Sequence, residues 1–367
     1  MSTPLGLPSV SVIFAQAAEA AIGPAGVGSV ALVIKDAAIE EAGVAVFSSL
    51  SEALAAYAWT DANEQALTFA FYGKPASVIT ALLPAASALS VGYALLEARR
   101  FDVCTVAGLA EADAAGFITW AKAAYDDLHK RSLFITASTT APDHPAIVRV
   151  ETSGVTVAGG ALTTPSYELL PLVASAIAGQ QLWESLTYLI LPIIEDCVHL
   201  TRAQADAAIA AGKLILYHDG EKVKIARGVT SLTTVTPTAG AVYGPEWRKI
   251  KVVRILNRIE DDVRVAIEDS YIGKMPNDYV HKQLLIAAVL DYLRALEAAG
   301  VLRTGSSTLD IHLEKQRTYL KTIRPTAEVE AMDEAALREA DTDDKLYLLG
   351  TVRPVDAIED VEITFTL

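Results

Sequence analysis

Residues 29–34 read SVALVI, a fully apolar run typical of a buried β-strand. Similar runs occupy residues 77–83, 101–107 and 133–137, and a helical pattern at 110–130 separates the last two. Continuous apolar strands that alternate with helices indicate a parallel sheet with both faces covered. The sequence therefore predicts an α/β fold for this part of the chain.

The composition argues against a nucleic-acid binder and indicates contacts between subunits. The chain has 367 residues, with 30 Lys and Arg against 45 Asp and Glu, a net charge of −15 and a pI near 4.9. This argues against a general nucleic-acid binder, because neutralising phosphates requires a basic surface. Hydrophobic residues make up 52% and charged residues 20%, whereas about a quarter are charged in an average soluble protein. We therefore expect extensive contacts between subunits, since a monomer cannot easily bury so many apolar side chains.

The cysteines, the histidines and the N-terminal residues show no pattern of a metal site or a targeting signal. Cys104 lies in an apolar run and is interpreted as a small buried hydrophobe; whether it or Cys197 crosslinks subunits stays open. The histidines lack metal-ligand spacing, which argues against a metal site: His129, His144, His199, His218, His281 and His312. Residues 1–14 show no signal-peptide pattern. Residues 75–96 are uncharged, but prolines and polar residues favour a strand, a turn and a helix over a membrane span.

Later in the chain the pattern changes to hairpins and long helices. Residues 147–157 and 213–227 each carry two short apolar segments around a turn, which predicts two hairpins. Long helices are expected at about 246–272 and from the N-cap Asn277 to 299. The first carries one apolar stripe, made of Val252, Leu256, Ile259, Val263 and Ile267. Three shorter elements follow: helices near 313–322 and 331–340, and a strand at 345–352.

Both ends of the chain carry alternating apolar residues. The members near the C-terminus are Val361, Ile363, Phe365 and Leu367. The members near the N-terminus are Val10, Val12 and Phe14, and a glycine-rich arm follows them. A half-apolar strand is an aggregation hazard unless something pairs with it. These segments are either edge strands of their own sheet or strands donated to neighbouring subunits.

One segment runs against the negative charge of the chain. Its five basic residues have no acid among them: Arg248, Lys249, Lys251, Arg254 and Arg258. On a helix the last three share one face. This basic stripe either pairs with groups of the same fold or docks on an acidic partner surface.

Motifs for catalysis are lacking. The glycines at 23, 26 and 28 form GxxGxG ahead of a strand, whereas a dinucleotide fingerprint is GxGxxG after one. The sequence has no Walker phosphate loop and no GxSxG nucleophile elbow. Acidic runs such as 260–262 are typical of a solvated helix face, and Asp143-His144 is interpreted as a turn. We expect no enzyme, no catalytic residue, no metal and no cofactor; the alternative is an α/β hydrolase or nucleotide-binding enzyme.

A set of short motifs lies in a characteristic order along the chain. These are VALVIKD at 30–36, PDH at 142–144, SLTY at 185–188, the segment 212–233 with its Asp-Gly turn, KVVRIL at 251–256 with IEDD at 259–262, YIGK at 271–274, ND at 277–278, and the ending from 352. Their order and spacing resemble the contractile tail sheath proteins of bacteriophages and phage-tail-like bacteriocins. The resemblance covers essentially the whole chain.

The resemblance implies a fold with four segments. It implies a subtilisin-like parallel-sheet domain without protease activity plus an α+β C-terminal domain, with extended N- and C-terminal strand arms. The expected segments are an N-terminal arm at 1–28, an α/β domain at 29–240 with hairpins near 147–163 and 213–228, a tube-facing C-terminal domain at 241–355 with two long helices, and a C-terminal arm strand at 356–367. Larger sheath proteins carry inserted domains, and residues 34–101 leave no room for one.

The resemblance also implies a function and partners. It implies a structural subunit that polymerises as stacked hexameric rings around an inner tube and contracts by subunit repacking. In the family, arms of adjacent subunits complete one another's small β-sheet, which favours strand donation here, and the basic stripe then faces the tube. Implied partners are further copies of this chain, the tube protein, and baseplate and terminator proteins, without direct nucleic acid or membrane insertion. We expect synthesis in the bacterial host cytoplasm and a final place in a phage tail or a phage-tail-like particle.

Overall fold

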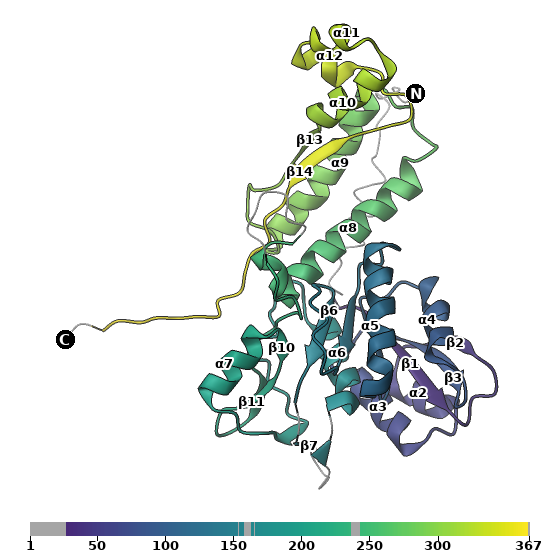
Figure 1. The fold of residues 1–367 in the computed structure, drawn as a ribbon, viewed down its shortest axis with the longest axis vertical. Coiled ribbons are helices and arrows are strands. Elements are labelled where there is room, and N and C mark those ends of the chain that lie inside the picture. The colour runs from purple at the N-terminus through teal and green to yellow at the C-terminus, as the bar shows by residue number, and fades with distance from the viewer. Residues whose placement is uncertain (1–26, 153, 158–162, 165, 236–242, 366–367) are drawn as a thin grey trace, which may run out of the picture. The chain divides into compact units, whose positions relative to one another are not determined.

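The structure, a computed structural model, describes residues 27–152, 154–157, 163–164, 166–235 and 243–365 (Figure 1). The predicted N-terminal strand with Val10, Val12 and Phe14 lies outside these residues, as does Leu367. Contacts divide the chain into two compact units. The sheet unit contains residues 27–258 and 356–365, and the helical unit contains residues 259–355. The domain boundaries expected from the sequence stay a prediction.

The sheet unit is built on a seven-stranded sheet among the described residues, in the order β10-β6-β5-β4-β1-β3-β2 (Figure 1). Its strands are β1 (Val30–Asp36), β2 (Gly43–Phe47), β3 (Val78–Pro84), β4 (Val103–Val106), β5 (Leu133–Thr136), β6 (Ile147–Val150) and β10 (Lys213–Leu214). All neighbours run parallel except β2, which is antiparallel to β3. The mostly parallel α/β sheet predicted from the apolar runs is therefore confirmed.

Helices cover both faces of this sheet. They are α2 (Leu50–Ala56), α3 (Asp61–Tyr72), α4 (Leu89–Glu97), α5 (Glu111–Asp126) and α6 (Leu170–Gly179). Tyr93 of α4 stacks on Trp120 of α5 with ring centroids 4.6 Å apart, whereas α3 packs against α6. The side chains of residues 30–34 on β1 are fully buried, although successive residues point to opposite faces. The fully apolar run in the sequence thus reflects burial on two sides.

The uncharged stretch at residues 75–96 contains strand β3 and helix α4 with a turn between them, as predicted. Among the described residues, no helix has the length and apolar character that crossing a membrane would require.

Smaller elements flank the large sheet. Strands β7 (Val155–Val157), β8 (Thr163–Thr164) and β9 (Ile194–Asp196) form one antiparallel sheet, and β11 (Leu216–His218) pairs with β12 (Val223–Ile225) around the predicted Asp-Gly turn. The other predicted hairpin was wrong in its pairing, because β6 joins the large sheet and β7 pairs with β8 and β9. Burial explains this: Ile147 and Val148 are both fully buried, so this strand needs cover on two faces. The remaining elements are the 3-10 turns η1 (Ser166–Glu168) and η2 (Pro245–Arg248) and helix α7 (Arg202–Ala210).

Helix α8 (Ile250–Ser270) runs from the sheet unit into the helical unit. The helical unit also contains α9 (Tyr279–Ala298), β13 (Thr308–Ile311), α10 (Leu313–Ile323), α11 (Thr326–Glu330), α12 (Glu334–Glu339) and β14 (Leu348–Thr351). The two long helices are confirmed, but Asp278 caps α9 and accepts the N–H of His281 at 2.9 Å. The predicted cap, Asn277, instead donates its side-chain amide to the carbonyls of Asp343 and Lys345.

Candidate assembly interface

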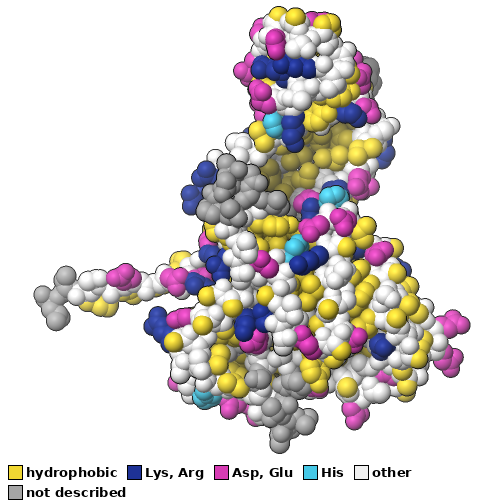
Figure 2. Space-filling model, viewed as in Figure 1, with side chains coloured by type: hydrophobic (Ala, Val, Ile, Leu, Met, Phe, Trp, Pro, Cys, Tyr) yellow, Lys and Arg dark blue, Asp and Glu magenta, His cyan; other side chains and the backbone are white. Residues whose placement is uncertain are grey.

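Residues 361–365 form an exposed segment in which apolar and polar side chains alternate. Val361, Ile363 and Phe365 are 70%, 68% and 85% exposed, and hydrophobic side chains line this segment (Figure 2). Residues 361–365 form neither helix nor strand, although their alternation predicts a strand. A strand needs a neighbouring strand for its main-chain hydrogen bonds, and the described part of the chain supplies none here. The role of these residues as an inter-subunit arm stays a prediction.

The helical unit contains a short strand pair that is open to addition. Strands β13 and β14 pair antiparallel, with Thr308 opposite Thr351 and Ile311 opposite Leu348, and no third strand joins them in the described chain. Strand β13 packs against α9, and Ile311 is buried, whereas Leu349 is 57% exposed. An isolated pair is marginally stable in water, and each outer edge offers main-chain N–H and C=O groups. Within the described chain, each strand of the pair therefore has one edge without a neighbouring strand.

Two members of the basic stripe, Arg254 and Lys251, pack within the sheet unit. Arg254 donates to the carbonyl oxygen of Gln180 at 2.7 Å, and burial lowers the pKa of Arg254 to about 10. Lys251 is only 6% exposed. Burial also lowers the pKa of Lys251, against the opposing effect of the carboxylates of Asp356 and Glu359. These two cations therefore serve the packing of this chain.

The outer members of the stripe, Arg248, Lys249 and Arg258, are half-buried. Lys249 forms an ion pair with Asp356, and Arg248 donates to the carbonyl of Ala210 at 3.2 Å. The tube-facing role of the stripe stays a prediction, and Arg248, which is half-buried and lies at the start of the stripe, is a position at which to test it.

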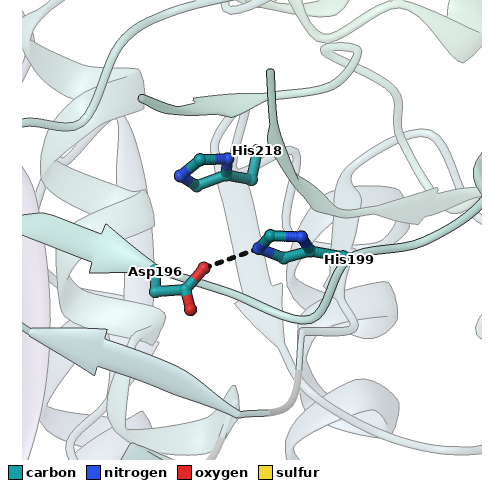
Figure 3. Close-up of side chains that lie close together, drawn as sticks. All are labelled: Asp196, His199 and His218. Atoms are coloured by element: carbon teal, nitrogen blue, oxygen red, sulfur yellow. Dashed lines mark hydrogen bonds and ion pairs between the residues drawn. The ribbon is translucent and has the colours of Figure 1, made fainter. Parts of the chain in front are cut away.

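Asp196, His199 and His218 form a cluster that the sequence did not indicate (Figure 3). Ligand atoms of the three side chains lie within 4.8 Å of one another. Nε2 of His199 lies 2.9 Å from Oδ1 of Asp196, and this hydrogen bond holds the pKa of Asp196 below its usual range. No spacing rule finds such a group, because His218 comes from another strand than Asp196.

The geometry of this cluster does not suit a metal ion. The rings of His199 and His218 stack at 17° with centroids 4.9 Å apart. Nitrogen lone pairs lie in the ring plane, so two nearly parallel stacked rings cannot aim at one ion. Nδ1 of His218 also accepts the N–H of Gly220 at 3.0 Å, which places the proton of the neutral ring on Nε2.

The other sequence candidates have structural roles. Cys104 and Cys197 are both buried free thiols; burial raises the pKa of Cys104, and it raises the pKa of Cys197 to about 11. Asp143 accepts the backbone N–H groups of Thr233 and Thr234 at 2.7 and 3.0 Å, so it joins two loops. Burial would raise the pKa of Asp143, but these donors outweigh it and hold the pKa well below its usual range.

Comparison with known proteins identifies the family of this chain. A sequence model of the phage tail sheath C-terminal domain matches residues 243–367. A tail sheath protein of Clostridium phage phiCD119 is 30% identical over 366 residues, which is 98% of each chain. The chain therefore belongs to the phage tail sheath protein family. It is a structural, non-enzymatic component of a phage tail or a phage-tail-like particle.

Solved structures show the same fold at low identity. The sheath tail protein of Desulfitobacterium hafniense matches with a TM-score of 0.68 and 16% identity, covering 84% of this chain and 93% of that chain. The sheath of the anti-feeding prophage in its contracted state matches with a TM-score of 0.68 and 14% identity, covering 100% and 99%. The mixed α/β fold with its mostly parallel sheet is thus a sheath protein fold.

Proposed function

We propose that this chain polymerises as stacked rings into a helical sheath around an inner tube, and that the sheath contracts by subunit repacking. Head-to-tail contacts whose rotation does not close generate an open helix. The likeness to the contracted sheath of the anti-feeding prophage supports this assembly. Two packings of one subunit that differ in stability would store the energy that drives contraction.

The proposed link between subunits is strand donation. The observation that carries it is that one chain holds both an exposed alternating arm and an open strand pair. The arm of one copy, with Val361, Ile363 and Phe365, adds to the β13–β14 pair of a neighbour. Main-chain hydrogen bonds then give affinity, and alternate side chains give specificity. The N-terminal Val10, Val12 and Phe14 form the second donated strand of the same proposal.

The experiment is a deletion of residues 361–367, followed by negative-stain microscopy of the purified subunit. We expect wild-type protein to form rings or tubules as its concentration rises, and the deleted protein to stay folded and unassembled. A triple variant Val361→Ser, Ile363→Ser and Phe365→Ser should behave like the deletion. The matched control changes the other face, Glu362→Ser and Thr364→Ser, and should assemble. Tubules from the deleted protein contradict strand donation.

Tube binding is a second part of the proposal. The substitution Arg248→Glu should weaken co-sedimentation with tubes of the tail tube protein, because it reverses a charge that is proposed to attract an acidic tube surface. The test uses low salt, since salt screens the attraction between exposed charges. Arg202→Glu, at a 96% exposed side chain on α7, is the matched control. Equal co-sedimentation of both variants contradicts a tube-facing Arg248.

The remaining parts of the proposal concern finer architecture and terminal partners. The sheet unit is proposed to be subtilisin-like, and the chain to divide into an arm at 1–28, an α/β domain at 29–240, an α+β domain at 241–355 and an arm at 356–367. A matching structure of the anti-feeding prophage baseplate, with a TM-score of 0.68, supports contacts of an end ring with baseplate proteins. Contacts of the opposite end ring with terminator proteins belong to the same proposal.

A further inference from the structure

Within the C-terminal segment, Glu359 differs sharply from its two exposed neighbours. The side chain of Glu359 is 8% exposed, whereas its neighbours Ile358 and Asp360 are 89% and 88% exposed. A carboxylate is costly to bury unless charged or polar partners compensate it. The buried carboxylate of Glu359 is therefore expected to have charged or polar partners.

Three donors surround the buried carboxylate. Oε1 of Glu359 accepts the hydroxyls of Ser185 at 3.0 Å and Thr187 at 2.7 Å, and Oε2 accepts Nε of Arg227 at 3.0 Å. The N–H of Gly228 donates to Oγ1 of Thr187 at 3.1 Å. With that lone pair occupied, the hydroxyl proton of Thr187 is free to point at the carboxylate. Backbone groups of the sheet unit thus orient the cradle formed by Ser185, Thr187 and Arg227.

Further ion pairs hold the same segment on either side of Glu359. Arg227 also donates from Nη2 to Asp360 at 2.6 Å, and Lys249 pairs with Asp356. The hydrogen bonds to Asp360 and Glu359 raise the pKa of Arg227 against the effect of burial. Cations of the sheet unit therefore meet all three acids of residues 356–360.

We propose that residues 356–360 are an intramolecular anchor, in which the cradle grips Glu359 and fixes the point where the donated arm leaves its own sheet unit. The anchor deepens the strand-donation proposal and takes its purpose from it. Apolar alternation starts directly after the anchor, at Val361. Charge-assisted hydrogen bonds constrain direction more tightly than apolar contact does. Load on a donated strand then passes into the sheet unit through Glu359 and Arg227.

Cleavage by a glutamate-specific endoprotease tests the anchor in the unassembled full-length subunit. The enzyme must accommodate the glutamate side chain, so it cuts after exposed Glu362 and is excluded from buried Glu359. Mass spectrometry separates the two released peptides, residues 363–367 and residues 360–367. The ratio of the two cuts compares neighbouring sites in one molecule, which cancels differences in enzyme activity.

We expect Thr187→Val and Arg227→Gln each to raise the cut after Glu359, relative to Glu362, by about tenfold or more, because each removes a hydrogen bond to a charged group. Thr187→Val is nearly isosteric and keeps the test valid if Arg227→Gln does not fold. Arg202→Gln is the matched control: Arg202 is 96% exposed and pairs only with Asp206 in the described chain, at 3.8 Å. This control should leave the ratio unchanged.

Two results overturn the anchor. The first is equal cutting after Glu359 and Glu362 in the wild-type protein, or a ratio that Thr187→Val leaves unchanged. The second is protection of Glu359 that disappears on dilution, since the tail of another copy then fills the cradle. Failure of strand donation looks different: tubules form without residues 361–367, while the cleavage ratio of the full-length subunit keeps its value.

Discussion

The two units of this chain treat their strands in opposite ways. In the sheet unit, β1 has a partner on each side, and residues 30–34 are fully buried. In the helical unit, β13 and β14 pair only with each other within the described chain, and Leu349 is 57% exposed. The inner strands of the sheet unit thus have a neighbour on each side, whereas β13 and β14 each have a strand on one side only within the described chain.

Helix α8 shows the same contrast along a single element. All of its buried residues lie between Ile250 and Asn257, on the part that belongs to the sheet unit. The predicted apolar stripe continues through Val263 and Ile267, but these side chains are only half-buried in the single chain. The excess of apolar residues in the composition therefore lies partly on surfaces that this chain alone leaves open.

The largest expected effect is in the core of the sheet unit. Phe134 is fully buried, with ring centroids 5.4 Å from Trp120 and 6.2 Å from Phe117. Phe134→Ala should lower the free energy of unfolding by about 3–5 kcal/mol, because it leaves a cavity. Leu349→Ala should change it by less than about 0.5 kcal/mol. Urea unfolding followed by tryptophan fluorescence suits the first variant, since all four tryptophans lie in the sheet unit; circular dichroism serves for the second.

Equal losses for Phe134→Ala and Leu349→Ala would break the comparison, because they would mean that the open strand pair is packed as tightly as the sheet.

A glycine at the end of one helix in each unit, Gly179 and Gly300, allows a second comparison of packing. A Cβ on Gly179, at the end of α6, would lie 1.8 Å from the carbonyl oxygen of Gly73, so Gly179→Ala should cost about 3 kcal/mol or more. Gly300 follows α9 at φ +72° with open space around it, so Gly300→Ala should cost about 1 kcal/mol from backbone strain alone. Thermal unfolding of both variants measures the difference. A greater loss for Gly300→Ala contradicts the close α3–α6 contact.

Asp36 makes the stability of the sheet unit depend on pH. Burial would raise the pKa of Asp36, but N–H groups of Ala38 and Thr60, the Thr60 hydroxyl and the Asn63 amide lower it to about 2. The folded pKa lies below the unfolded value of 3.8, so the stabilisation is complete above about pH 4 and is lost as the pH falls towards 2. It amounts to about 2 kcal/mol.

Asp36→Asn should flatten the fall in unfolding free energy between about pH 4 and pH 2, measured by urea titration at each pH. Glu40→Gln, at an exposed acid in the loop after β1, is the charge-matched control and should keep the slope. An unchanged slope in Asp36→Asn means that Asp36 is not the acid-sensitive group of the sheet unit.

The sequence was sufficient to predict the large sheet, because a strand buried on both faces is apolar at nearly every position. Residues 30–34 show this rule directly, and residues 78–83 depart from it only at Thr80, whose hydroxyl donates to the carbonyl of Ala45 at 3.2 Å. The pairing of β6 escaped prediction, since local turn chemistry at residues 153–154 suggested a hairpin while burial of Ile147 demanded the sheet. The N-cap of α9 was misplaced by one residue, because Asn277 and Asp278 are both good caps.

The assembly features divide in the same way. Alternation revealed the apolar arm, since it is a local pattern around Val361, Ile363 and Phe365. The cradle for Glu359 escaped prediction, because Ser185, Thr187 and Arg227 are distant from it in sequence and form no motif with it. The sequence places Lys251, Arg254 and Arg258 on one helix face, but Lys251 is buried. The sequence pattern does not show which side of this helix other elements cover.

The smallest expected effect comes from removing one tyrosine hydroxyl in each unit. Tyr125 donates to the side chain of Asn257 and Tyr292 to the carboxylate of Asp262, each at 2.7 Å. Tyr125→Phe leaves a buried oxygen of Asn257 without this donor and should cost about 1–2 kcal/mol. Asp262 is only half-buried, so water replaces the lost donor and Tyr292→Phe should cost about 0.5 kcal/mol. Amide hydrogen exchange of α5 and α9 measures both losses, and a larger change in α9 on Tyr292→Phe than in α5 on Tyr125→Phe contradicts the prediction.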